Sequence, residues 1–276
     1  MVEAIERLAT YFGGEQTRQG VLARAALGRP GADDAELARR LLGSLGAEVR
    51  SDGSIGGAVV PTIWRVHELM DLSQGGRQPE VVARLMEWIL ALQGKPGAFG
   101  EGCDKVRHAQ RVCEHYVGGF FAPAPPGQRL APVTLPNGKV FRNEPAARFV
   151  ISCLALRAAL RTGFATRTAV NRHVVSLVHL ADQWTGWNIY FAPDVVVSGL
   201  HTLAVAGGSW AHGGAVARVV SLVAANQRED GEWPGADLFL VLEALLAAGT
   251  DDARNAVRRA APALAARQRA DGTFGP

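Results

Sequence analysis

The sequence is poor in the features that mark membrane, disulfide-bonded and nucleic-acid-binding proteins. It has no apolar run close to the ~20 residues that a membrane-spanning helix requires. Its three cysteines, Cys103, Cys113 and Cys153, are not spaced as a disulfide framework, which favours a reducing compartment. The net charge of +3 comes from scattered arginines rather than a basic block. This argues against a nucleic-acid partner and only weakly for an anionic small ligand.

The N-terminal segment and the overall composition favour a globular helical protein. The N-terminal MVEAIERLATYF has the apolar rhythm of an amphipathic helix rather than the pattern of a secretory signal. A chain of 276 residues with 48% hydrophobic and 20% charged residues is long enough to bury a large core. We therefore predict one domain, 1–276, in the cytoplasm, without a transmembrane segment; transient contact with a membrane surface stays open.

A glycine-centred turn recurs six times along the chain, at intervals of 41 to 48 residues. Several of these turns are Asp-Gly or Asn-Gly, in which glycine adopts positive φ without a steric penalty. An aromatic residue two or three positions later can pack onto the turn, and a preceding glutamine can bond the loop backbone. Such regular spacing indicates an internal repeat. The central glycines are Gly53, Gly97, Gly138, Gly186, Gly231 and Gly272.

Each turn is followed by an apolar helix, which we call inner, and then by a more amphipathic one, which we call outer. The predicted inner helices are Gln16–Leu27, Val59–Leu72, Asp104–Val117, Pro145–Arg161, Asp194–Ala206 and Asp237–Ala248. The predicted outer helices are Ala35–Leu45, Pro79–Leu92, Thr166–Gln183, His212–Asn226 and Asp252–Gln268.

One outer helix is missing from this scheme. The chain between Gly118 and Asn143 has too many prolines for a helix, and its Asn-Gly turn favours a short β-hairpin. We therefore expect an irregular repeat with a hairpin insertion near 120–143. The last turn, at Gly272, has to close onto the N-terminal helices. The pattern predicts an all-α fold, an (α/α)6-type toroid of helical hairpins.

The repeat resembles a known one. Gln-x-x-Asp-Gly-x-Trp or Phe, present as Gln227–Trp233 and Gln268–Phe274, resembles the repeat of terpenoid cyclases and protein prenyltransferase β subunits. The resemblance covers nearly the whole chain and implies the α/α toroid. It is less specific for one activity, because both enzyme groups carry the repeat.

A second resemblance concerns the fourth inner helix. GWNIYFAPDVVVSGL, from Gly186 to Leu200, is similar to the squalene-hopene cyclase stretch that carries Asp-x-Asp-Asp. In that family the middle Asp protonates the alkene. Here Asp194 fills the first place, whereas Val196 and Val197 stand at the other two carboxylate positions. The resemblance therefore implies cyclase chemistry without the usual acid motif, on one toroid instead of the two domains of squalene cyclases.

Acidic residues stand at the predicted N-termini of four inner helices, which meet at one rim of a toroid cavity: Asp104, Glu144, Asp194 and Asp237. Helix capping alone, worth about 0.3–1 kcal/mol, is the alternative role for each. Asp194 and His201 are two helical turns apart and share a face. We interpret Asp194 as the catalytic acid and His201 as a hydrogen-bonding base or cation-quenching group. A capping Asp and a core His are the alternative.

The third inner helix carries a polar stripe at spacings of four, three and four residues: Asp104, His108, Arg111 and His115. Three interpretations stay open. The stripe faces water, it lines the cavity beside Tyr116 and contacts an anion or substrate, or it helps to bind zinc together with Cys103.

Aromatic side chains on inner helices or at their entrances can stabilise carbocations. They are Trp64, Tyr116, Phe149, Tyr190, Phe191 and Phe239. Polar residues also fall in the expected interior and favour a functionalised substrate over a pure hydrocarbon; they are His67, Glu68, Asp71, Arg148 and Arg157.

Together these patterns favour a terpene-cyclase-like enzyme that cyclises or rearranges a prenylated or diphosphate-bearing isoprenoid by acid and carbocation chemistry in the cavity. The partner is a hydrophobic isoprenoid or another amphiphilic small molecule. No cofactor is predicted, although magnesium or zinc is left open. Two alternatives remain, a zinc-dependent prenyltransferase-like enzyme and a non-catalytic toroid that binds a lipid or a partner protein.

Overall fold

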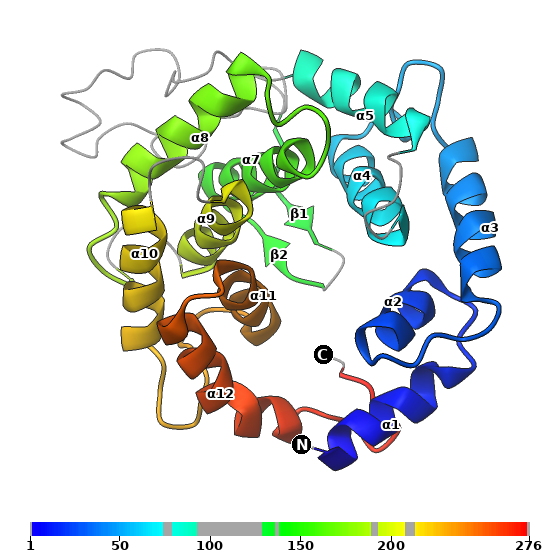
Figure 1. Ribbon diagram of the computed structural model, residues 1–276. Coiled ribbons are helices and arrows are strands. Elements are labelled where there is room, and N and C mark those ends of the chain that lie inside the picture. Colours follow the sequence, from blue (N-terminus) through cyan, green and yellow to red (C-terminus); the bar gives the residue numbers. More distant parts are fainter. Residues whose placement is uncertain are drawn as a thin grey trace. The chain divides into compact units, whose positions relative to one another are not determined.

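The computed structural model describes residues 2–73, 79–92, 129–135, 138–188, 193–207 and 213–274. Within these ranges the chain forms eleven helices and one small antiparallel sheet (Figure 1). The elements are α1 (Val2–Gly13), α2 (Arg18–Ala26), α3 (Asp34–Ala47), α4 (Val59–Ser73), α5 (Glu80–Ala91), β1 (Val133–Thr134), β2 (Val140–Phe141), α7 (Glu144–Leu160), α8 (Thr168–Ala181), α9 (Pro193–Ala206), α10 (Gly213–Ala225), α11 (Leu238–Ala248) and α12 (Asp251–Ala266).

The helices that the sequence predicts are confirmed wherever the structure describes the chain. Each observed helix begins and ends within a few residues of its predicted bounds, and the N-terminal amphipathic segment is α1. The hairpin is also confirmed, because Val133 pairs with Phe141 and Thr134 with Val140. The predicted helix Asp104–Val117 lies outside the described residues. The protein is therefore mainly α-helical, as the apolar periodicity indicates.

The chain divides into two compact units. Unit 1 comprises Met1–Trp88 and Ala261–Pro276, and unit 2 comprises Ile89–Ala260. In unit 1, α2 contacts α1, α3 and α4, and α3 contacts α4. Val21, Leu37 and Leu72 form an apolar cluster between α2, α3 and α4, which the partly buried leucines of α3 extend. The single domain predicted from composition stays a prediction.

The core of unit 2 is built around α9. This helix packs against α7 on one side and α11 on the other, and α8 and α10 also contact it (Figure 1). The indole of Trp184 lies directly on Gly199 of α9, where a Cβ would be 2.1 Å from its Cη2 atom. The same indole meets Phe149 of α7 edge to face, with ring centroids 6.3 Å apart. Trp184 therefore joins α7 to α9, and only glycine fits beneath it.

The three described Asp-Gly turns share one hydrogen-bond pattern. In the turn at Gly231, Arg228 N–H donates to the carbonyl of Glu232, and Gly231 N–H donates to the carbonyl of Arg228. Asp230 accepts from the N–H of Glu232 at 2.9 Å. The turns that start at Arg50 and Arg269 repeat these contacts. The shared first residue of the turn is an arginine, a feature that the Gln-based pattern did not contain.

The central glycine of each turn lies against the backbone of a helix. A Cβ on Gly231 would be 2.6 Å from the carbonyl oxygen of Arg259 in α12. Gly53 meets Arg84 of α5 in the same way, and Gly272 meets Arg7 of α1. All three glycines have φ between 87° and 89°. Backbone conformation and close approach therefore both require glycine at this position.

In two of the three turns a preceding glutamine bonds the loop backbone, as predicted, and it also bonds the helix that receives the turn. Gln227 Nε2 donates to the carbonyls of Gly231 and of Ala256 in α12, both at 3.0 Å. Gln268 Nε2 donates likewise to Gly272 and to Ala4 of α1. The turn at Gly272 thus docks on α1 through the same contacts by which the turn at Gly231 docks on α12.

We predict that Gly231→Ala destabilises unit 2 more than Gly138→Ala does. Both glycines have nearly the same φ, 87° and 84°, but among the described residues no atom outside its chain neighbours lies within 4 Å of a Cβ on Gly138. Gly138→Ala should therefore cost about 1–2 kcal/mol from backbone strain alone, and Gly231→Ala about 1–3 kcal/mol more from overlap with Arg259. Urea denaturation followed by circular dichroism measures the free energy of unfolding of both variants. Equal losses would contradict a cost from overlap with Arg259.

A buried histidine in α8 predicts a loss of stability in acid. His173 is fully buried, and burial lowers the pKa of its imidazole to about 3. In the unfolded chain the pKa is about 6.5, so the unfolded state binds the proton more strongly between these values. Stability is therefore complete above about pH 6.5 and falls towards pH 3 by up to about 1.4 kcal/mol per pH unit.

His173→Gln should flatten this pH dependence. His179 is exposed on the same helix, and His179→Gln is the matched control that keeps the wild-type slope. Urea titrations at a series of pH values measure the free energy of unfolding of all three proteins. An unchanged slope in His173→Gln would show that another group causes the acid sensitivity.

Candidate functional site

The buried carboxylate of Asp194 lies at the N-terminal end of α9. The residue is 4% exposed. Its Oδ2 lies 2.8 Å from Nζ of Lys139, and its Oδ1 accepts a hydrogen bond from the backbone N–H of Asp237 at 3.2 Å. The carboxylate is thus paired with an ammonium group and accepts from a backbone N–H at a helix N-terminus. Asp194 therefore links the hairpin, α9 and the start of α11 within unit 2.

Local contacts fix the start of α9 against the segment before α11. Pro193 is the first residue of α9, a position for which its fixed φ is suited. Trp187, just before α9, donates from Nε1 to the carbonyl of Pro234 at 2.8 Å. A Cβ on Gly235 would lie 3.4 Å from Cγ of Pro193. These contacts hold Asp194 in place independently of its own charge.

Asp237 is the N-cap of α11. Its Oδ1 accepts from the N–H groups of Phe239 and Leu240 at 3.0 and 3.1 Å. The capping role that the sequence offered as an alternative is therefore the one that the contacts of Asp237 support. Phe239, a predicted substrate contact, is half-buried in the first turn of this helix.

Glu144, the first residue of α7, holds the base of the hairpin. Its carboxylate accepts from the N–H of Leu130 at 3.0 Å and of Ala131 at 2.7 Å, and Nε of Arg148 lies 2.6 Å away. Burial alone raises the pKa of Glu144, but the two N–H donors and the charge of Arg148 outweigh it and lower the pKa. Glu144 and Arg148, both predicted as substrate contacts, therefore form a charged pair that holds the chain before β1.

Two further predicted residues of this unit, His201 and Phe149, lie further along their helices. His201 is half-buried, two turns after Asp194 on α9. Phe149 is fully buried and packs against Trp184, so its described contact belongs to the core of unit 2.

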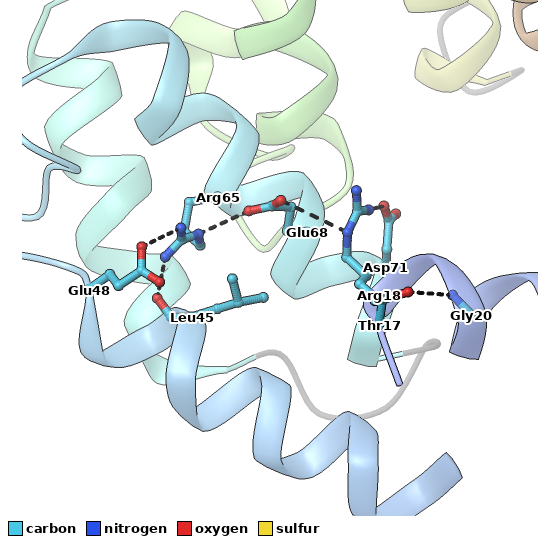
Figure 2. Close-up of polar contacts among 8 residues, drawn as sticks. All are labelled: Thr17, Arg18, Gly20, Leu45, Glu48, Arg65, Glu68 and Asp71. Carbon is cyan, nitrogen blue, oxygen red and sulfur yellow. Dashed lines mark hydrogen bonds and ion pairs between the residues drawn. The ribbon is translucent and has the colours of Figure 1, made fainter. Parts of the chain in front are cut away.

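In unit 1 the predicted residues lie on α4. Trp64 and His67 have ring centroids 5.8 Å apart, with His67 buried and Trp64 half-buried. Beside them, Arg18 at the start of α2 pairs with Asp71 at 3.0 Å and with Glu68 at 3.9 Å (Figure 2).

Arg65 continues this chain of charges towards α3. Its guanidinium pairs with Glu68 at 3.0 Å and with Glu48 at 2.9 Å, and it donates to the carbonyl of Leu45 at 2.5 Å (Figure 2). The Arg65 side chain is 10% exposed, whereas that of Glu48 is 56% exposed. Acidic and basic groups alternate, so this face of α4 has compensated charges and joins α2, α3 and α4.

We expect Arg65→Met to destabilise unit 1 by about 1.5–3 kcal/mol, because it removes several charge-assisted hydrogen bonds from a buried group. Arg39→Met is the matched control. Arg39 also pairs with a glutamate three residues away, Glu36, but both side chains are exposed. Its loss should stay within about 0.5 kcal/mol. Chemical denaturation compares the two, and similar values would contradict a special role for Arg65.

Several predicted residues lie outside the described residues, namely Cys103, Asp104, His108, Arg111, His115, Tyr116, Tyr190 and Phe191. The three interpretations of the polar stripe therefore stay predictions. Among the residues that the structure describes, no group of three or more His, Cys, Asp and Glu side chains is arranged to hold a metal ion.

Lys139 is the residue of this site that the sequence analysis missed. The sequence does contain a signal, because only three of the 29 basic residues are lysines. Lys139 follows the Asn-Gly turn of the hairpin and reaches Asp194 across 55 positions of the chain. Residue spacing gave no reason to connect them.

A scan against protein-family models and searches of the curated proteins and the solved structures found no match to the chain. The resemblance to the terpenoid cyclase repeat therefore rests on the residues of this sequence alone. Within the described ranges, every helix is too short or too polar to cross a membrane.

Proposed function

We propose that the chain is an α/α toroid with a terpene-cyclase-like activity, which cyclises or rearranges a prenylated or diphosphate-bearing isoprenoid by acid–base and carbocation chemistry. The repeat supports the toroid. Three Asp-Gly turns each dock on a helix through the same glycine contact, and for the last turn that helix is α1. An N-terminal helix that receives the last turn is what a closed array of repeats requires.

The observation that carries the enzymatic proposal is the buried, paired carboxylate of Asp194 at the first turn of α9. Burying a charge is costly unless it is paired, so such a group is a candidate for chemistry as well as for structure. Because both of its oxygens face donors, the carboxylate can stabilise a carbocation or accept a proton from one, and this role replaces the acid role that the resemblance implies for Asp194. His201 on the same helix is the second candidate for proton transfer.

Asp194→Asn keeps the shape of the side chain and its acceptor for the Asp237 N–H, but removes the charge. We expect product formation from prenyl diphosphates or polyenes to fall by about 100-fold or more. Asp182→Asn, in the exposed pair with Arg218, is the control that should leave the rate unchanged. Gas chromatography with mass spectrometry measures the products, and circular dichroism checks the fold. Full activity of Asp194→Asn would exclude the assigned role.

A non-catalytic binding toroid is the second candidate. It is favoured by the fact that both oxygens of Asp194 already have structural partners, Lys139 and the N–H of Asp237. Native mass spectrometry distinguishes the two functions. A retained hydrophobic ligand with no turnover of any prenyl diphosphate or polyene supports binding, whereas turnover supports the enzyme.

A further inference from the structure

The pairing of Lys139 with Asp194 joins a rare residue type to the most buried acidic group of the proposed site. The chain contains three lysines, and arginine supplies its other basic residues. The Lys139 side chain is 31% exposed and the Asp194 side chain 6%. Lysine is a compact point charge on a flexible stem, whereas arginine presents a planar fork of donors. A single ammonium fits one carboxylate oxygen and leaves the other to the backbone N–H of Asp237.

The hairpin that carries Lys139 is held at its base by a second carboxylate. Leu130 and Ala131, just before β1, donate their N–H groups to Glu144 at the start of α7. Lys139 directly precedes β2, and β2 contacts α7. The hairpin is therefore fixed to α7 at one end and reaches α9 through Lys139 at the other.

We propose that Lys139 is a positioning residue for Asp194, and that Glu144 fixes the hairpin so that Lys139 reaches it. This inference rests on the proposed function for the role of Asp194 in catalysis. Lys139 holds Oδ2 while the N–H of Asp237 holds Oδ1, so the orientation of the carboxylate is set from both sides. The ammonium also gives the buried carboxylate a charge partner, which lowers the cost of burying it.

The geometric part is tested without turnover. The Lys139 amine is acetylated by an N-hydroxysuccinimide ester, and peptide mass spectrometry follows the reaction. The rate in the native protein is compared with the rate in the urea-unfolded chain. A paired, partly buried ammonium reacts slowly, so native wild type should label several-fold more slowly than the unfolded chain. Asp194→Asn should restore labelling. Equal rates in the native and unfolded wild type would overturn the pairing.

Glu144→Gln tests the role of the hairpin base. We expect faster acetylation of Lys139 and faster hydrogen exchange at the Leu130 and Ala131 amides, with the helical circular dichroism retained. The control is Glu36→Gln, in the exposed pair with Arg39. If Lys139 is acetylated as slowly in Glu144→Gln as in wild type, Glu144 is not needed to hold Lys139 against Asp194.

The catalytic part is read from kinetics. Lys139→Met should lower kcat by about 100-fold or more, with little change in KM, and the double variant with Asp194→Asn should be no slower than Asp194→Asn alone. Lys139→Arg keeps the charge and should recover part of kcat. Additive losses, or no recovery with arginine, would overturn the positioning role. If wild type has no turnover while Lys139 is protected, the proposed function fails and the pair is structural only.

Discussion

The glycine-centred turn is the constraint on which the arrangement of helices depends. At Gly53, Gly231 and Gly272 the backbone approaches a helix carbonyl so closely that a Cβ would overlap it, and φ is positive at all three. The contact therefore needs glycine for two independent reasons. At Gly53 and Gly231 it fixes where the following inner helix, α4 or α11, begins relative to the helix that receives the turn, and at Gly272 it docks the turn on α1. The same Arg-x-Asp-Gly sequence therefore produces the same turn and the same helix contact at three places in the chain.

In unit 2 the starts of successive elements are connected by polar contacts. Lys139 of the hairpin reaches Asp194 on α9, and Asp194 reaches the backbone of Asp237 before α11. Glu144 holds the chain before β1 from the start of α7. The charges compensate one another, which lowers the cost of burying them. The contacts that stabilise the unit also fix the carboxylate of Asp194, so the structure and the proposed chemistry depend on the same atoms.

Sequence periodicity predicts the helices and the hairpin, but it does not predict the contacts of Asp194 and Glu144. Helix ends were found within a few residues because apolar spacing and turn glycines are local signals, and the cap at Asp237 follows from its position before α11. Partners distant in sequence were not found. Lys139 and Asp194 pair across 55 positions, and the carboxylate of Glu144 binds backbone groups that no side-chain pattern marks. Phe149 is predicted as a carbocation contact only from its place on an inner helix, and its described ring contact is with Trp184, which lies in a turn whose packing the period does not encode.

The distance between Lys139 Nζ and the carboxylate of Asp194 tests this account most directly. Solid-state NMR on protein labelled with ¹⁵N at lysine side chains and ¹³C at aspartate carboxyls can measure their dipolar coupling, and three lysines keep the ¹⁵N spectrum simple. The account predicts a strong coupling of one lysine to a carboxyl carbon, present in wild type and lost in Asp194→Asn and in Lys139→Met. Its absence in wild type, or its persistence in either variant, would contradict the pairing on which the proposed site depends.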